Sequence, residues 1–147
     1  MGQSTDAILF YGYCFEEGAE LLAEEFDGDW EAAYVLKMGL SPPVEPFPEK
    51  DGPGTAAIKA KYAAYWEAKR HLATKSGAVI GYHCSGDYPM PYVAIRASEI
   101  RAHCGYEREV VSLAVQPEWR AMLDEFCRIM NITPNGEPKW WLVSYWG

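Results

Sequence analysis

Residues 78–97 read AVIGYHCSGDYPMPYVAIRA, and this stretch decides the class of fold. Its two ends are runs rich in β-branched and aromatic residues, which predicts strands over 78–84 and 92–97. The segment between them, SGDYPMP at 85–91, has the Gly and Pro residues of a turn, and its prolines cannot donate to a central ladder. The stretch therefore predicts two strands joined by a turn.

Further strands are expected on both sides of this stretch. DAILFYGYCF at 6–15 is almost entirely apolar, as in a strand that is covered on both faces, and Gly12 in its middle indicates a bulge or a close backbone approach. Another strand is expected between 99 and 111, with CGYE at 104–107 as a second hairpin turn. The chain is expected to end with a strand over 139–146.

Helical patterns fill most of the remaining sequence. A helix over 56–74 is the clearest, because its apolar and charged side chains fall largely on different sides. Apolar residues recur with a period of 3.6 from Pro117 to Met130, which predicts the last helix. A short helix is expected within 16–26, followed by a helix that Asp29 caps and that runs to about residue 38.

Together these elements predict one globular domain, residues 1–147, of the α+β class. We expect one mixed or antiparallel sheet of about 4–5 strands, with about 4 helices packed on it. The segment LSPPVEPFPEKDGPG at 40–54 contains five prolines and is predicted to be a loop. Such a long loop is uncommon inside a compact domain and is often functional.

Composition restricts the class of protein. Hydrophobic residues make up 49% of the chain and charged residues 23%, which predicts a folded chain rather than a disordered one. No apolar run approaches the roughly 20 residues of a membrane helix, and MGQSTDAILF at the N-terminus lacks the basic region of a signal peptide. We therefore expect a cytoplasmic protein that makes no contact with a membrane.

The net charge of −8 is concentrated in EEGAELLAEEFDGDWE, residues 16–31, which has eight acidic residues and no basic one. Clustered carboxylates steer association electrostatically, so this segment predicts a protein partner with a basic surface. A solvated face that keeps the chain soluble is the competing interpretation. Direct binding to nucleic acid is disfavoured because the chain has no basic stripe. The residues expected to bind the partner are Glu16, Glu17, Glu20, Glu24, Glu25, Asp27, Asp29 and Glu31.

Two His-Cys pairs, at 83–84 and 103–104, are the candidates for chemistry. A thiolate beside an imidazolium, with a carboxylate to orient it, would be a nucleophile, and zinc prefers Cys, His and carboxylate ligands. The compact spacings of zinc motifs are absent, and buried thiols beside a satisfied histidine are the simpler interpretation. The candidate catalytic residues are Cys84, His83, Asp87, His103 and Cys104, and the candidate zinc ligands are His83, His103 and Cys14.

Three stretches, DAILFYGYCFEE, HCSGDYPMPYVAI and WWLVSYWG, together resemble a group of small uncharacterised proteins from phage and bacterial genomes. The resemblance spans most of the chain and implies no catalytic residue. It implies a small acidic protein that binds a host protein and inhibits or redirects it. We therefore expect an interaction protein rather than an enzyme, and the alternative is a small Cys/His enzyme or zinc-binding protein.

Overall fold

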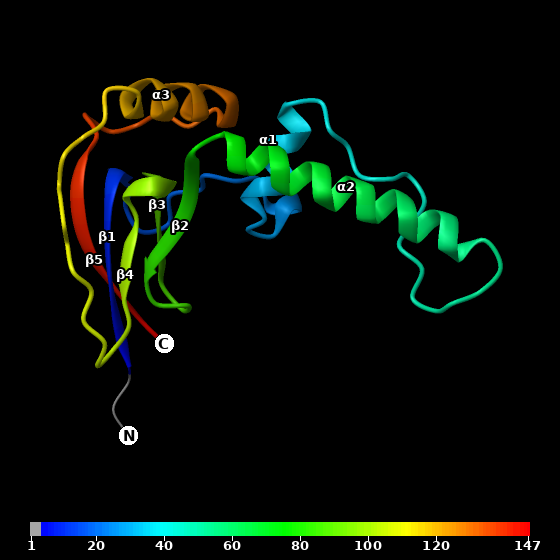
Figure 1. Ribbon diagram of the computed structural model, residues 1–147, viewed down its shortest axis with the longest axis horizontal. Coiled ribbons are helices and arrows are strands. Elements are labelled where there is room, and N and C mark those ends of the chain that lie inside the picture. The colour runs from blue at the N-terminus through cyan, green and yellow to red at the C-terminus, as the bar shows by residue number, and fades with distance from the viewer. Residues whose placement is uncertain (1–3) are drawn as a thin grey trace. The chain divides into compact units, whose positions relative to one another are not determined.

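The computed structural model describes residues 4–147, which form two compact units. The sheet unit comprises the chain through Leu21 together with Ser76–Gly147, and the helical unit comprises Leu22–Lys75. The sheet unit contains β1 (Thr5–Cys14), β2 (Ala78–Cys84), β3 (Pro89–Ile95), the 3₁₀ turn η2 (Arg96–Ser98), β4 (Ile100–Ala102), α3 (Trp119–Met130) and β5 (Lys139–Trp146). The helical unit contains η1 (Glu24–Phe26), α1 (Trp30–Lys37) and α2 (Thr55–Lys75) (Figure 1).

The five strands form one mixed sheet in the order β3-β2-β5-β1-β4. β1 pairs with β5 along one edge, while its other edge is shared between β4 and β3. β2 pairs antiparallel with β3 and makes one parallel bridge to β5, from Cys84 to Tyr145. The pairings among β1, β3, β2 and β5 therefore close a cycle, and the predicted α+β class with one mixed sheet is confirmed.

The inward face of this sheet holds the apolar core of the sheet unit. Ile8, Phe10, Tyr92 and Ala94 are fully buried there, and the rings of Phe10 and Tyr92 stack with their centroids 4.2 Å apart. Because strand residues alternate between faces, the even-numbered residues of β1 supply this core. Partly buried hydrophobic residues pack around it: Cys14, Val79, Trp141, Val143 and Tyr145.

The opposite face of the sheet packs against α3, which lies across one end of the strands (Figure 1). Tyr11 of β1 contacts the rings of Trp119 and Trp140, with centroids 5.6 and 5.7 Å away. The buried side chains of α3 recur at helical spacing, which confirms the helix predicted from the 3.6-residue period. These buried residues are Trp119, Leu123, Phe126, Cys127 and Met130.

The strand over 78–84 is confirmed, but its partner β3 begins at Pro89, so the predicted turn over 85–91 was too long. Pro91 faces Tyr82 across the β2–β3 pair, and its carbonyl accepts the N–H of Phe15 at 3.1 Å. A proline fits such a position because the position uses its carbonyl and needs no N–H.

The expected strand between 99 and 111 is present only as the three residues of β4. A turn follows it, since the N–H of Tyr106 donates to the carbonyl of His103 at 2.9 Å. The second hairpin was wrong, because residues 107–118 run on to α3 without pairing as a strand. Residues 103–118 are exposed, so no buried face favours a strand there.

In the helical unit, α1 begins where Asp29 was expected to cap it, and the Asp29 Oδ1 accepts the N–H of Ala32 at 2.9 Å. The helix predicted within 16–26 is wrong, because only the single turn η1 forms there. Gly18 has a φ of +77°, which is incompatible with a right-handed helix, and glutamates four apart would repel one another. Residues 4–147 consequently hold three α-helices rather than about four.

The predicted loop over 40–54 is confirmed, and so is the helix predicted over 56–74, which is α2. The loop packs against this helix. Phe47 lies against Tyr62 and Trp66, with ring centroids 5.2 and 5.4 Å away. Glu45 accepts from the Lys61 ammonium at 2.6 Å, and its carbonyl accepts from the Tyr62 hydroxyl at 3.0 Å. The proline-rich loop is therefore part of the packing of the helical unit.

Candidate functional site

The first His-Cys pair lies at the end of β2. His83 is half-buried on the face that carries Tyr92, with the two ring centroids 6.4 Å apart, and this burial lowers the pKa of His83. Cys84 is the next residue and the last of β2, where it pairs with Pro89 of β3 and Tyr145 of β5 and has a φ of +74°. Asp87 is exposed in the turn between β2 and β3.

The second pair, His103 and Cys104, follows β4 and is exposed. β5 and β1 lie between β2 and β4 in the sheet, so the structure does not place the two pairs side by side. Cys14 is at the far end of β1, where burial raises the pKa of its thiol to about 11. Across residues 4–147, no three or more His, Cys, Asp and Glu side chains gather in a way that suits a metal ion.

Asp6 is the functional candidate that the sequence reading missed. One carboxylate oxygen of Asp6 lies 2.9 Å from Nδ1 of His103 and 3.7 Å from the guanidinium of Arg101, and the other accepts the N–H of Cys104 at 3.3 Å. Burial opposes ionisation of Asp6, but these hydrogen bonds and charges prevail and lower its pKa. The sequence did contain a signal for Asp6, because an acidic residue at this position shares the inward face of a strand with the apolar residues Ile8 and Phe10.

A second polar contact lies on the same face of the sheet. The hydroxyl of the buried Tyr92 donates to the Glu99 carboxylate at 3.1 Å, and burial raises the pKa of that hydroxyl.

The Asp6–His103 contact has a clearer chemical consequence. When Nδ1 of His103 donates to Asp6, its Nε2 is left as an acceptor on a ring that is largely exposed, as in proton transfer by histidine.

The acidic segment crosses from the sheet unit into the helical unit after Leu21. Asp29 alone among its eight acidic residues forms an ion pair within residues 4–147, and its partner is Lys69 of α2. The Lys69 bond and the backbone N–H groups lower the pKa of Asp29 against the opposing effect of burial. The remaining seven have no ion-pair partner in the described chain: Glu16, Glu17, Glu20, Glu24, Glu25, Asp27 and Glu31.

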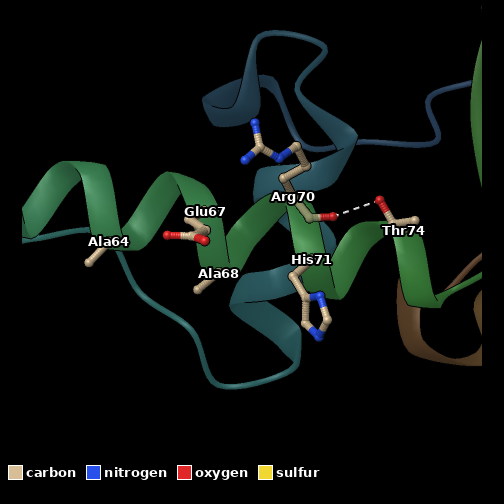
Figure 2. Close-up of a pocket in the computed structure, with 6 residues that line it drawn as sticks. All are labelled: Ala64, Glu67, Ala68, Arg70, His71 and Thr74. Carbon is tan, nitrogen blue, oxygen red and sulfur yellow. Dashed lines mark hydrogen bonds between the residues drawn. The ribbon is translucent and has the colours of Figure 1, made fainter.

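Among the hollows formed by residues 4–147, two bear on ligand binding. A groove of about 570 Å³ runs along α2 and is lined by Ala64, Glu67, Ala68, Arg70, His71 and Thr74. Figure 2 shows that these residues all come from one helix, with Arg70 and His71 extending in different directions. A convex helix surface cannot enclose a small molecule, so this groove is an open one.

The second hollow is a cavity of about 140 Å³ in the sheet unit. It is walled on several sides, by Tyr13 and Cys14 of β1, by residues 135–137 of the loop before β5, and by Lys139 and Trp141 of β5. Concave surroundings of this kind are what a small ligand requires.

Neither a protein-family model, nor a curated protein, nor a solved structure matches this chain. None of the helices within residues 4–147 has the length and apolar character to span a bilayer.

Proposed function

We propose that this chain is a small acidic interaction protein that presents the carboxylates of residues 16–31 to a partner protein with a basic surface. The resemblance to phage-encoded proteins makes a host protein the proposed partner, which the chain binds or inhibits in the cytoplasm. The observation that carries the proposal is that seven of the eight acidic residues have no ion pair within residues 4–147.

Unpaired carboxylates on neighbouring residues act together on an approaching charge. Elsewhere in the chain, acidic residues such as Glu45, Asp124 and Glu125 are neutralised by a lysine or arginine. The acidic segment has no basic residue of its own, so its field extends into solvent for roughly a Debye length, about 8 Å at physiological salt. Such a field accelerates association with a basic surface and weakens as salt is added.

Exchanging five of these glutamates for glutamine is expected to abolish capture of the partner. Glu16, Glu17, Glu20, Glu24 and Glu25 are exposed and unpaired in the described structure, so their exchange should change stability by no more than about 0.5 kcal/mol. The measurement is capture from host lysate on the immobilised chain, with bound proteins identified by mass spectrometry. A basic protein retained by the wild type should be lost, with affinity reduced by at least about tenfold.

A matched control removes the same charge from other places. Glu49, Glu67, Glu107, Glu109 and Glu118 are also exposed and have no ion pair in the described chain. Their exchange for glutamine should leave capture intact, whereas a merely solubilising charge predicts the same result for both variants. If the variant that lacks the five glutamates of residues 16–25 captures the partner as well as the wild type does, the proposal is wrong.

A second candidate function is Cys/His chemistry at His103 and Cys104, favoured by the 2.9 Å contact between Asp6 and His103. A carboxylate that holds Nδ1 of a histidine orients the ring and stabilises its protonated form. Sequence reasoning assigned the orienting role to Asp87, whereas the carboxylate that contacts His103 is that of Asp6. The zinc part of this alternative is tested by native mass spectrometry of chain purified without chelator under reducing conditions.

If His103 activates Cys104, Asp6→Asn should slow the alkylation of Cys104 by iodoacetamide at pH 7 by at least about threefold. The rate is read from peptide mass spectrometry after a time course. Cys84 is the internal control, because it lies on β2 and its rate should not change. Equal Cys104 rates in the two proteins would mean that the Asp6–His103 contact is structural.

A further inference from the structure

The cavity of about 140 Å³ in the sheet unit has the size and the walls of a ligand site. An engineered cavity of about 150 Å³ in another protein holds one benzene molecule, so this one has room for a single aromatic ring. The indole of Trp141 forms part of its wall, and its Nε1–H donates to the carbonyl of Gly12 at 3.1 Å, which fixes the plane of the ring. The wall is therefore organised before any ligand arrives.

The charges at the cavity select the sign of its ligand. Glu137 lines the cavity, but its carboxylate is paired with Arg120, which also binds Asp124. Lys139 lines it too, and its ammonium lies 5.0 Å from the centre of the Trp141 ring, with no carboxylate partner in the described chain. Lys139 is therefore the charged side chain of the wall that has no ion-pair partner within residues 4–147.

The other titratable groups of the wall are neutral near pH 7. Burial raises the pKa of Cys14 to about 11 and also raises the pKa of Tyr13. Neither a thiolate nor a phenolate therefore repels an anion there. Asn135 adds an amide that can donate to a carboxylate oxygen.

We propose that this cavity binds a small aromatic carboxylate, with the ring inside the cavity in contact with Trp141 and the carboxylate at the mouth against Lys139. The proposal does not depend on the acidic segment, because none of the residues that line the cavity belongs to residues 16–31. A cationic ligand fits less well, since the carboxylate of Glu137 is already engaged and the ammonium of Lys139 already lies over the Trp141 ring. Contact between the ligand's ring and the indole, together with an ion pair to Lys139 at the mouth, would hold the ligand.

The test is a titration with benzoate, followed through the indole N–H resonance of Trp141 in two-dimensional NMR of the ¹⁵N-labelled chain. Trp141→Phe assigns that resonance by its disappearance. We expect saturable shifts with a dissociation constant on the order of 1 mM, as is usual for so small a ligand. Benzylamine, which has a similar ring and the opposite charge, should not shift the resonance.

Lys139→Met keeps a long apolar side chain over Trp141 and removes the ammonium. This substitution should lower the affinity for benzoate by about tenfold or more, which is the usual effect of deleting a charged hydrogen-bond partner. Lys75→Met is the matched control, because Lys75 is exposed in the helical unit and has no ion pair in the described chain. Absence of a benzoate shift up to about 20 mM, equal binding by Lys139→Met, or equal binding of benzylamine would each overturn the proposal.

Discussion

Replacing Gly12 by alanine is expected to remove most of the stability of the sheet unit. A Cβ atom at Gly12 would lie 2.0 Å from the carbonyl oxygen of Val93 and 2.9 Å from Cα of Ala94. Both of these are backbone atoms of β3, which pairs with β1 at this point. They cannot rotate away as a side chain would, so the two strands have to separate or unpair.

The expected cost is about 3 kcal/mol or more, at the upper end of what overpacking costs in a core. Most single domains have only about 5–15 kcal/mol of total stability, so the variant should unfold at much lower urea concentration. The measurement is urea unfolding followed by circular dichroism, together with hydrogen exchange of the β1 and β3 amides. Faster hydrogen exchange of these amides would place the loss of stability in the sheet unit, because the helical unit contains neither strand.

Gly86→Ala is the matched control for this prediction. Gly86 is exposed in the turn after β2, and a Cβ atom there would come no closer than 3.9 Å to the Tyr145 hydroxyl. Its exchange should change the free energy of unfolding by about 0.5 kcal/mol or less. A Gly12→Ala protein that is as stable as Gly86→Ala would show that β1 and β3 do not approach as closely as the structure has them.

Gly12 also shows how much of this fold local patterns predict. An apolar strand with one glycine in its middle indicated a close backbone approach, and β3 makes that approach. The helices α2 and α3 were predicted from the spacing of their apolar residues, α1 from its cap at Asp29, and the strand over 78–84 from its β-branched and aromatic residues. Prolines misled the reading of 85–91, because β3 uses them where no N–H is needed.

Contacts between distant residues were beyond the sequence patterns. Asp6 and His103 are 97 positions apart, and no local period joins an acidic residue in one strand to a histidine after another. The closure of the sheet by the Cys84–Tyr145 bridge is equally non-local. In the acidic segment, a local pattern predicted a structure that does not form. Three apolar residues indicated a helix, but repulsion between like charges and the backbone conformation of Gly18 prevent it.

Replacing Gly81 by alanine should destabilise the sheet unit nearly as much. The cause is a clash with a neighbouring side chain, so a second substitution that shortens this side chain can test it. A Cβ atom at Gly81 would lie 2.2 Å from Cζ and 2.4 Å from the hydroxyl oxygen of Tyr92. The Tyr92 ring is fully buried, stacked on Phe10 and hydrogen-bonded to Glu99, so it has no free space to enter. We expect a loss of about 2–3 kcal/mol from overpacking.

The obstructing atoms belong to a side chain, in contrast to those at Gly12, so shortening that side chain should relieve the clash. Tyr92→Leu removes the distal ring atoms and the hydroxyl, at an expected cost of about 2–4 kcal/mol for the lost packing and hydrogen bond. In that background, Gly81→Ala should cost about 1 kcal/mol or less. The two exchanges should therefore couple by about 1–2 kcal/mol in a double-mutant cycle measured by urea unfolding.

Gly12→Ala supplies the control for this cycle. Its clash is with the β3 backbone, so Tyr92→Leu should not reduce its cost, and the coupling between positions 12 and 92 should be smaller than that between 81 and 92. Strictly additive costs for Gly81→Ala and Tyr92→Leu would mean that the Tyr92 ring does not lie over Gly81. The stack on Phe10 and the bond to Glu99 would then no longer explain why a glycine stands at the centre of β2.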